Sequence, residues 1–221
     1  MTTPTPSTGE TLDELRLRLA PKVAENAAFD GWSRRALETT AAQMRVDADI
    51  VALAFDGGAV AMIDAWFASI DAGMAATFAP DVLAGMKIRQ RITALVEARL
   101  AIMARQREAL RRAQTVLAMP QNVVAATRLG WRAADGIWRA AGDNAADFSH
   151  YTKRATLGAI YAATLLVFVN DESEGWADTR AFLARRIDEV MRFEKAKAKM
   201  AERAEMRFDP VRFLGRLRYR A

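Results

Sequence analysis

An uncharged stretch from Ala155 to Val169 constrains the fold of this chain more than any other feature. Its apolar residues leave no polar face, which is the pattern of a helix surrounded by other helices. The stretch falls short of the roughly 20 residues that a helix needs to cross a bilayer, and Arg154 and Asp171 bracket it closely. We therefore predict a buried central helix.

The composition points to helices throughout. The chain has 221 residues, of which 12 are glycine and 6 are proline. Alanine is abundant and strand signals are nearly absent, so the fold class predicted is all-α. With no cysteine and a single histidine, thiolate chemistry is excluded and few transition-metal sites are possible. We expect no metal and no cofactor.

The two ends of the chain differ in charge. The first ten residues are polar and lack the basic and apolar regions of a signal peptide, so we expect a cytoplasmic protein. Arginine outnumbers lysine 26 to 6, which we interpret as bacterial coding bias. Residues 194–221 hold nine basic and four acidic residues, which accounts for the whole net charge of +5.

The N-terminal third resembles the helix-turn-helix head of TetR-type regulators. One helix is expected from Ser33, a short one after Val46 and a longer one from about Gly58. A DNA reader needs basic and small polar side chains here. Residues 36–78 instead carry six acidic residues and only Arg45 as a base. Such a surface repels DNA, so we expect a degenerate head kept for packing, and no DNA partner.

Two later segments each allow two interpretations. The basic residues from Lys87 to Arg112 form either a solvated face or a contact with an acidic partner or lipid headgroups. Val124, Trp131 and Trp138 repeat every seven residues, so they share a helix face. Large aromatic residues there either fill a core or line a lipid cavity.

No motif in the chain indicates an enzyme. A nucleophile motif, a glycine-rich phosphate loop and metal-ligand spacing are all missing from the sequence. His150 is the one possible base near neutral pH, and no nucleophile can be nominated beside it. We interpret it as a partly exposed residue at a helix start, and the chain as non-enzymatic.

The second half of the chain resembles the Coq-nine family, the lipid-binding accessory proteins of ubiquinone biosynthesis. The likeness covers most of the chain beyond about residue 80. It is carried by Trp131, Asp135, Trp138, Ala141-Gly142-Asp143, the run Asp147 to Ala155, Ile160-Tyr161-x-x-Thr164, Trp176-x-Asp178-Thr179-x-x-Phe182-Leu183 and Arg186-Ile187. One departure is His150-Tyr151, where the family usually has Trp-Tyr.

The resemblance implies a TetR-like helical bundle that encloses a polyprenylated ubiquinone precursor. Apolar walls would replace the bilayer around the isoprenoid tail. We expect the cavity between the helix that bears Trp131 and Trp138 and the central helix. Its expected lining is Leu100, Met103, Val124, Trp131, Trp138, Leu157, Ile160, Tyr161, Thr164, Leu165 and Phe168.

The resemblance also implies a protein partner, the demethoxyubiquinone hydroxylase, a membrane-associated di-iron enzyme. The expected contact is an exposed apolar patch at the start of the central helix. The matching residues are Ile137, Ala140, His150 and Tyr151. A homodimer is also possible. Two alternatives stay open: a TetR-type ligand-sensing transcriptional regulator, and a membrane scaffold without a ligand cavity, since a packed core and a lined cavity use the same residue types.

The C-terminus predicts a short amphipathic helix. Asp209 and Pro210 are a good N-cap and first-turn pair. Such a short helix is marginal in water, so its apolar side must be buried, either on the protein's own core or on anionic lipid. The expected membrane-contacting residues are Val211, Phe213, Leu214 and Leu217 on one side and Arg212, Arg216 and Arg220 on the other.

These segments give an expected domain organisation. It comprises a disordered tail (1–9), the head (10–79), the lipid-binding domain (80–193), a charged stalk or linker (194–209) and the amphipathic helix (210–221). The last segment would hold the protein peripherally on the inner face of the cytoplasmic membrane.

Truncation after Met206 tests the membrane helix. Each arginine near an anionic surface contributes on the order of 1 kcal/mol, so the truncated protein should no longer float with anionic liposomes while keeping its melting temperature. High salt should weaken binding of the full chain. Liposome binding by the truncated protein, or loss of its fold, would assign the tail to the core instead.

Overall fold

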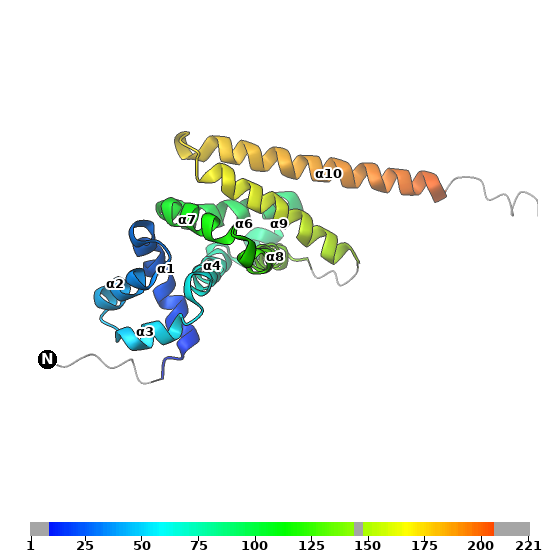
Figure 1. Cartoon of the computed structure of the whole chain (residues 1–221). Helices are drawn as coiled ribbons and strands as arrows, with labels where there is room; N and C mark the ends of the chain where they lie inside the picture. Colours follow the sequence, from blue (N-terminus) through cyan, green and yellow to red (C-terminus); the bar gives the residue numbers. More distant parts are fainter. Residues whose placement is uncertain (1–8, 144–147, 206–221) are drawn as a thin grey trace, which may run out of the picture. The chain divides into compact units, whose positions relative to one another are not determined.

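The computed structural model describes residues 9–143 and 148–205, and every regular element among them is a helix (Figure 1), which confirms the all-α class. The chain divides into two compact units, residues 1–183 and 184–221. The expected head therefore belongs to the same unit as the helices that follow it. The main helices are α1 (Leu12–Asp30), α2 (Arg34–Met44), α3 (Ala48–Ala54), α4 (Gly58–Thr77), α5 (Pro80–Ala84), α6 (Ile88–Met103), α7 (Arg107–Leu117), α8 (Val123–Ala140), α9 (Phe148–Phe168) and α10 (Ala177–Glu205).

The head forms the three helices that the sequence predicts. The hydroxyl of Ser33 accepts a hydrogen bond from the Ala36 N–H and caps α2, and Asp47 caps α3 through the N–H groups of Asp49 and Ile50. Such side-chain caps satisfy backbone donors that a helix start leaves unpaired. The predicted starts near Ser33, after Val46 and at Gly58 are confirmed.

The helix at the centre of the first unit is α4. It packs against α1, α6, α7 and α8, and Ile63, Trp66 and Ile70 on it are fully buried. The indole N–H of Trp66 donates to Gln106 Oε1 at 2.9 Å, and its ring lies 5.4 Å from that of Trp32. Although α4 is apolar and long enough to cross a membrane, its contacts are those of a core helix.

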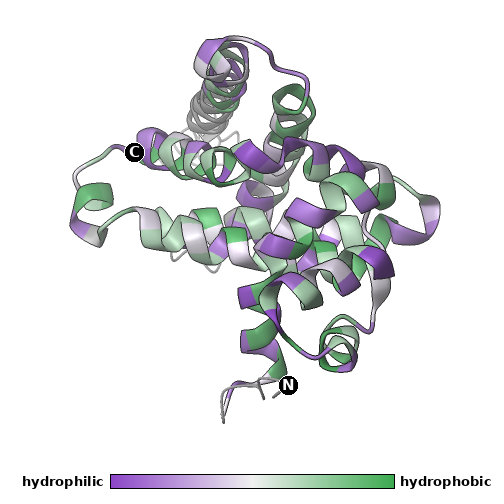
Figure 2. Ribbon diagram, turned by 90° about the vertical axis from the view of Figure 1, so that its left-hand side faces the viewer, coloured by the Kyte–Doolittle hydropathy of each residue, from purple (hydrophilic) through white to green (hydrophobic). Residues whose placement is uncertain are grey.

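The uncharged stretch forms α9, but the expectation that it is surrounded on all sides is wrong. The helix packs mainly on α8 and also touches α6. One of its sides is exposed along its length. In Figure 2 most helices carry both apolar and polar residues, as amphipathic helices do. The exposed side of the uncharged stretch instead carries three alanines and Leu166. Alanine occurs both in cores and on surfaces, so the sequence alone does not decide its burial.

The contact between α8 and α9 is close at two glycines. A Cβ atom added to Gly158 would lie 3.6 Å from the carbonyl oxygen of Gly130 and 3.9 Å from the Cβ of Ala134. The two helices therefore touch through their backbones at this crossing. A lipid cannot lie between them there, which corrects the expected position of the cavity at this level.

The reversal after α9 is fixed by one carboxylate. Asp171 accepts hydrogen bonds from the N–H groups of Ser173 and Thr179, each at 2.8 Å, and from both hydroxyls at 2.5 Å. Burial opposes ionisation, but these four donors outweigh it and lower the pKa of Asp171 well below its usual range. The ring of Trp176 packs edge-on against Phe168 at 5.3 Å. The turn thus directs the chain into α10.

We predict that Gly158→Leu destabilises the protein and that Ala159→Leu does not. A side chain at position 158 would force α8 and α9 apart, at a cost of about 1–3 kcal/mol, whereas Ala159 is exposed. Urea unfolding of both variants measures the difference. Equal stability of the two would contradict the close packing of the helices.

Candidate ligand and partner site

Three aromatic side chains, His150 and Tyr151 at the start of α9 and Trp131 on α8, form what we call the aromatic patch. Tyr151 is 61% exposed. Its ring centroid lies 6.0 Å from that of Trp131 on α8 and 5.2 Å from that of His150. These separations fall in the range of favourable aromatic pairs, so α8 and α9 present one joined apolar surface.

Four charged residues, which we call the ionic clasp, hold this end of α9 against α8. They are Asp135, Asp143, Lys153 and Arg154. Arg154 is 2% exposed and pairs with Asp135 at 2.6 Å and with Asp143 at 3.4 Å, while Lys153 pairs with Asp143 at 2.9 Å. Arg154 also donates to the carbonyl oxygen of His150 at 3.3 Å, which ties the clasp directly to the aromatic patch.

The clasp lowers the pKa of one of its two carboxylates, that of Asp143. Burial alone would raise the pKa of Asp143, but the hydrogen bonds and charges of Lys153 and Arg154 outweigh it and lower the pKa. The indole N–H of Trp138 donates to the carbonyl oxygen of Lys153 at 3.1 Å, and the Lys153 ammonium lies 5.4 Å from the indole centroid. Trp138 of α8 therefore helps to hold the start of α9, and with it the aromatic patch, in place.

The exposed side of α9 extends the patch. Ala155, Ala159, Ala162 and Leu166 are exposed at spacings of three and four residues, so they share one face with Tyr151. We call these four residues the α9 stripe. At 1.5 Å per residue the stripe is about 16 Å long. It offers an uncharged surface that continues from the aromatic rings.

A second group of charges lies inside the first unit, and we call it the core charge cluster: Asp64, Asp71, Arg99 and Arg132. Arg99 on α6 is 0% exposed and donates to Asp71 on α4. Arg132 on α8 donates to Asp71 at 3.2 Å and also pairs with Asp64. The fully buried charge of Arg99 needs such a partner, because a desolvated charge is costly alone.

The cluster reaches α9 through Tyr161. The Nε of Arg99 donates to the phenolic oxygen at 2.9 Å, and the guanidinium carbon lies 5.0 Å from the ring centroid. Burial raises the pKa of Tyr161, which keeps the phenol neutral. Burial opposes the charge of Arg99, but Tyr161 and Asp71 outweigh it and raise the pKa of the guanidinium.

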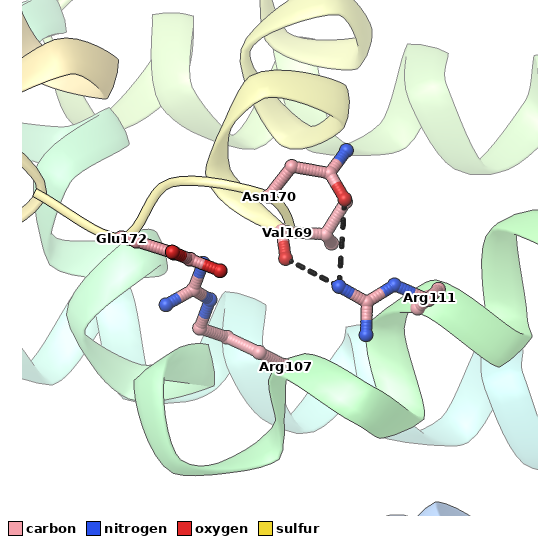
Figure 3. Close-up of a pocket in the computed structure, with 5 residues that line it drawn as sticks. All are labelled: Arg107, Arg111, Val169, Asn170 and Glu172. Atoms are coloured by element: carbon pink, nitrogen blue, oxygen red, sulfur yellow. Dashed lines mark hydrogen bonds between the residues drawn. The ribbon is translucent and has the colours of Figure 1, made fainter.

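A polar hollow of about 440 Å³ lies at the other end of α9 and is lined by Arg107, Arg111, Val169, Asn170 and Glu172 (Figure 3). Arg111 donates to the carbonyl of Val169 at 2.7 Å and Arg107 to that of Asp171 at 2.5 Å. Both arginines thus satisfy carbonyls that the end of α9 leaves unpaired. Within the described residues, no group of three His, Cys, Asp or Glu side chains is placed to hold a metal ion.

Comparison with known proteins identifies the segment that carries the patch and the clasp. Residues 123–194 match the model of the COQ9 family. The rat protein named "Ubiquinone biosynthesis protein COQ9, mitochondrial" is 40% identical over 96 residues, and the human protein of the same name is 38% identical over 96 residues. Over residues 123–194 the chain is therefore similar to the COQ9 family.

The likeness to COQ9 proteins is partial in length. The match covers 43% of this chain but 31% of the rat protein and 30% of the human one. The Drosophila melanogaster COQ9 protein is 26% identical over 187 residues, which is 83% of this chain and 57% of that protein. The match therefore spans about a third of the rat and human relatives.

The fold of the chain is TetR-like. A crystal structure of a TetR transcriptional regulator from Nitrosomonas europaea ATCC 19718 superposes with a TM-score of 0.62 and 27% identity, and the match covers 79% of this chain and 97% of that one. The predicted TetR-like bundle is confirmed.

The residues expected to line a lipid cavity separate into two groups. One group is buried in the first unit: Leu100, Met103, Leu157, Tyr161, Thr164, Leu165 and Phe168. The others are at or near the surface. Val124 is 82% exposed, Trp131 joins the aromatic patch, and Trp138 and Ile160 are half-buried. The heptad of Val124, Trp131 and Trp138 is a real helix face, but it does not line one enclosed cavity with the buried group.

The expected partner patch needs one correction. Ile137 is 0% exposed, because it lies on the inner side of α8, so the expectation that it is part of an exposed surface is wrong. Ala140 and His150 are half-buried, and Tyr151 is exposed as expected. The predicted membrane residues, Val211, Arg212, Phe213, Leu214, Arg216, Leu217 and Arg220, lie outside the described residues.

Sequence reasoning missed the core charge cluster. The basic residues from Lys87 to Arg112 were expected to face outward, but Arg99 is fully buried. A signal was present on α4, where Asp64 and Asp71 stand seven residues apart in an apolar helix and so share a face. Two carboxylates on the inner side of such a helix indicate buried arginine partners.

We predict that Asp143→Asn lowers stability near neutral pH by about 1–3 kcal/mol, because it weakens the ionic clasp. Since the folded pKa of Asp143 is lowered, its contribution is present above the ordinary pKa and is lost as pH falls through the folded value. The gap in unfolding free energy between the two proteins should therefore close on acidification. Calorimetry across a pH series measures it, and a constant gap would contradict the assignment.

Proposed function

We propose that this protein is a non-enzymatic, lipid-binding protein of ubiquinone biosynthesis. It binds a polyprenylated quinone precursor and presents it to a membrane-associated hydroxylase. The observation that carries the proposal is the exposed aromatic patch, held by the ionic clasp, within the segment that matches the COQ9 family. The rat and human relatives are named for ubiquinone biosynthesis.

The patch has the physical character of a binding surface for another protein. A soluble chain that keeps Tyr151 exposed beside Trp131 leaves apolar area in water, which such proteins do mainly at interaction sites. The buried ionic pairs of Arg154 restrict the first turn of α9, so the rings are ordered before a partner arrives. Ordering in advance reduces the entropy that binding must overcome.

The lipid-binding part of the proposal is supported by the inner side of α9. Leu157, Leu165 and Phe168 are buried there together with Leu100 and Met103 of α6. This group is apolar and lies next to the polar Arg99 and Tyr161 pair. A ligand with an isoprenoid tail and a polar head needs both kinds of surroundings. The basic C-terminal residues would keep the protein at an anionic membrane, the source of such a lipid.

A ligand-sensing transcriptional regulator is the second candidate, and the TetR-like fold favours it. The charge of the head opposes it. Around α3, the exposed residues include Asp47, Asp49, Leu53 and Asp56. Two of these carboxylates lie on the segment that would enter a DNA groove, where phosphate contacts require positive charge.

Tyr151→Ala tests the proposed partner surface, with Phe29→Ala as the matched control. Both are exposed aromatic residues, but Phe29 (84% exposed) lies on α1, outside the family segment. We expect Tyr151→Ala to weaken association with the purified hydroxylase by about tenfold or more and to lower cellular ubiquinone, while Phe29→Ala changes neither. Unchanged association in Tyr151→Ala would remove the patch from the partner surface.

The same preparations are then extracted with organic solvent, and the bound lipid is identified by mass spectrometry. Tyr151→Ala should retain the lipid of the parent protein, because the patch lies outside the buried apolar group. Absence of any isoprenoid lipid from the full chain would contradict the lipid-binding half of the proposal.

A further inference from the structure

One nitrogen of the core charge cluster has no hydrogen-bond partner. The Nη2 atom of Arg99 is buried and no atom of the described residues accepts its protons. The other nitrogens of this guanidinium donate to Asp71 and to Tyr161. A buried charged donor without an acceptor costs more than an ordinary hydrogen bond contributes, so this position calls for an acceptor atom.

A second donor stands beside it. The phenolic oxygen of Tyr161 accepts the proton of Arg99 Nε, so its own O–H is left to donate. Burial raises the pKa of this phenol and keeps that proton in place. Among the described residues, no hydrogen bond donated by this hydroxyl is found, although the Asp71 carboxylate lies close enough to influence the phenol. Arg99 Nη2 and the Tyr161 hydroxyl thus form a pair of unused donors.

The charge balance around this donor pair selects the kind of acceptor. Arg99 and Arg132 bring two positive charges, and Asp64 and Asp71 bring two negative charges. Arg128 reaches Asp64 only from the surface, at 3.4 Å and with a side chain 66% exposed. The inner cluster is neutral as it stands, so an anion would add an uncompensated buried charge. A neutral oxygen adds none.

The surroundings are apolar and include side chains that can adapt. Leu100 and Met103 of α6 and Leu157 of α9 are buried on the helices that carry the donor pair. Near Asp71, a Cβ atom at Gly136 of α8 would lie 3.9 Å from Asp71 Oδ1 and 4.0 Å from Met74 Cε. Gly136 itself adds no side chain at this point, and its neighbour Met74 is a methionine, the apolar residue that changes shape most easily.

We propose that Arg99 and Tyr161 form the polar end of the apolar ligand site and donate hydrogen bonds to one neutral acceptor oxygen, a ring carbonyl or an ether, on the head group of the ligand. The inference rests on the proposed function and adds the residues that recognise the head group of the ligand, together with the kind of group they select, a neutral acceptor oxygen. Asp71 and Arg132 are positioning residues, since they fix the guanidinium and carry its charge.

The test uses the full chain and two probes of equal tail length, 2-decyl-1,4-benzoquinone and decylbenzene, delivered from cyclodextrin and measured by titration calorimetry. The parent protein should bind the quinone about tenfold more tightly than the hydrocarbon. Tyr161→Phe, which removes only a hydroxyl, should lose about tenfold for the quinone and nothing for decylbenzene. Thr115→Val is the control, because it removes a hydroxyl at an exposed position of α7 outside the aromatic patch, and it should bind both probes as the parent does.

Arg99→Lys is a second variant, because it keeps a positive charge beside Asp71 but lacks Nη2. It should show the same selective loss, so the inference does not depend on one variant folding. If both variants bind both probes as the parent does, the donor pair holds a water molecule and the inference is overturned while the proposed function stands. An equal loss for both probes also overturns it. Failure of the parent protein to bind either probe overturns the proposed function itself.

Discussion

The pairing of two aspartates on α4 with arginines from neighbouring helices organises the first unit. Because α4 is otherwise apolar, Asp64 and Asp71 must find positive partners inside the protein, and Arg99 and Arg132 supply them from α6 and α8. Removing Asp71 would leave the fully buried Arg99 without its carboxylate partner, and an uncompensated buried charge typically costs about 3–5 kcal/mol. These contacts therefore specify one packing arrangement of α6 and α8 on α4. Apolar contacts alone would be less specific, because cores tolerate alternative packing.

The helical architecture was largely predictable from the sequence, but the identity of the central helix, α4, was not. Capping residues such as Ser33 and Asp47 locate helix starts, because they act on backbone groups a few residues away. The centre depends on contacts between distant segments. The uncharged run of α9 fits burial equally well on one side or on all sides, since alanine is tolerated in both places. Only the packing of α4 against α1, α6 and α8 decides the matter.

The candidate site shows the same division. The exposure of Tyr151 follows from its place at a helix start within a recognisable run, and it was predicted correctly. The burial of Arg99 and Ile137 was not predicted. Arg99 lies in a basic segment that was expected to face outward, and Ile137 was expected to belong to the exposed patch, but both are buried. Their burial depends on which faces of α6 and α8 contact the core. The periodicity of one helix shows which residues share a face, but not which neighbouring helix that face contacts.

The position of Arg154 has a consequence for how the chain can vary. Its guanidinium contacts Asp143, before the link between α8 and α9, and the carbonyl of His150, after that link, so one side chain holds both flanks together. Lengthening a connection whose ends are already held costs little, because loop entropy grows only with the logarithm of length. Insertions between these two anchors are thus tolerable in related chains, whereas the arginine itself is not exchangeable for lysine, which lacks the forked geometry needed to reach three acceptors at once.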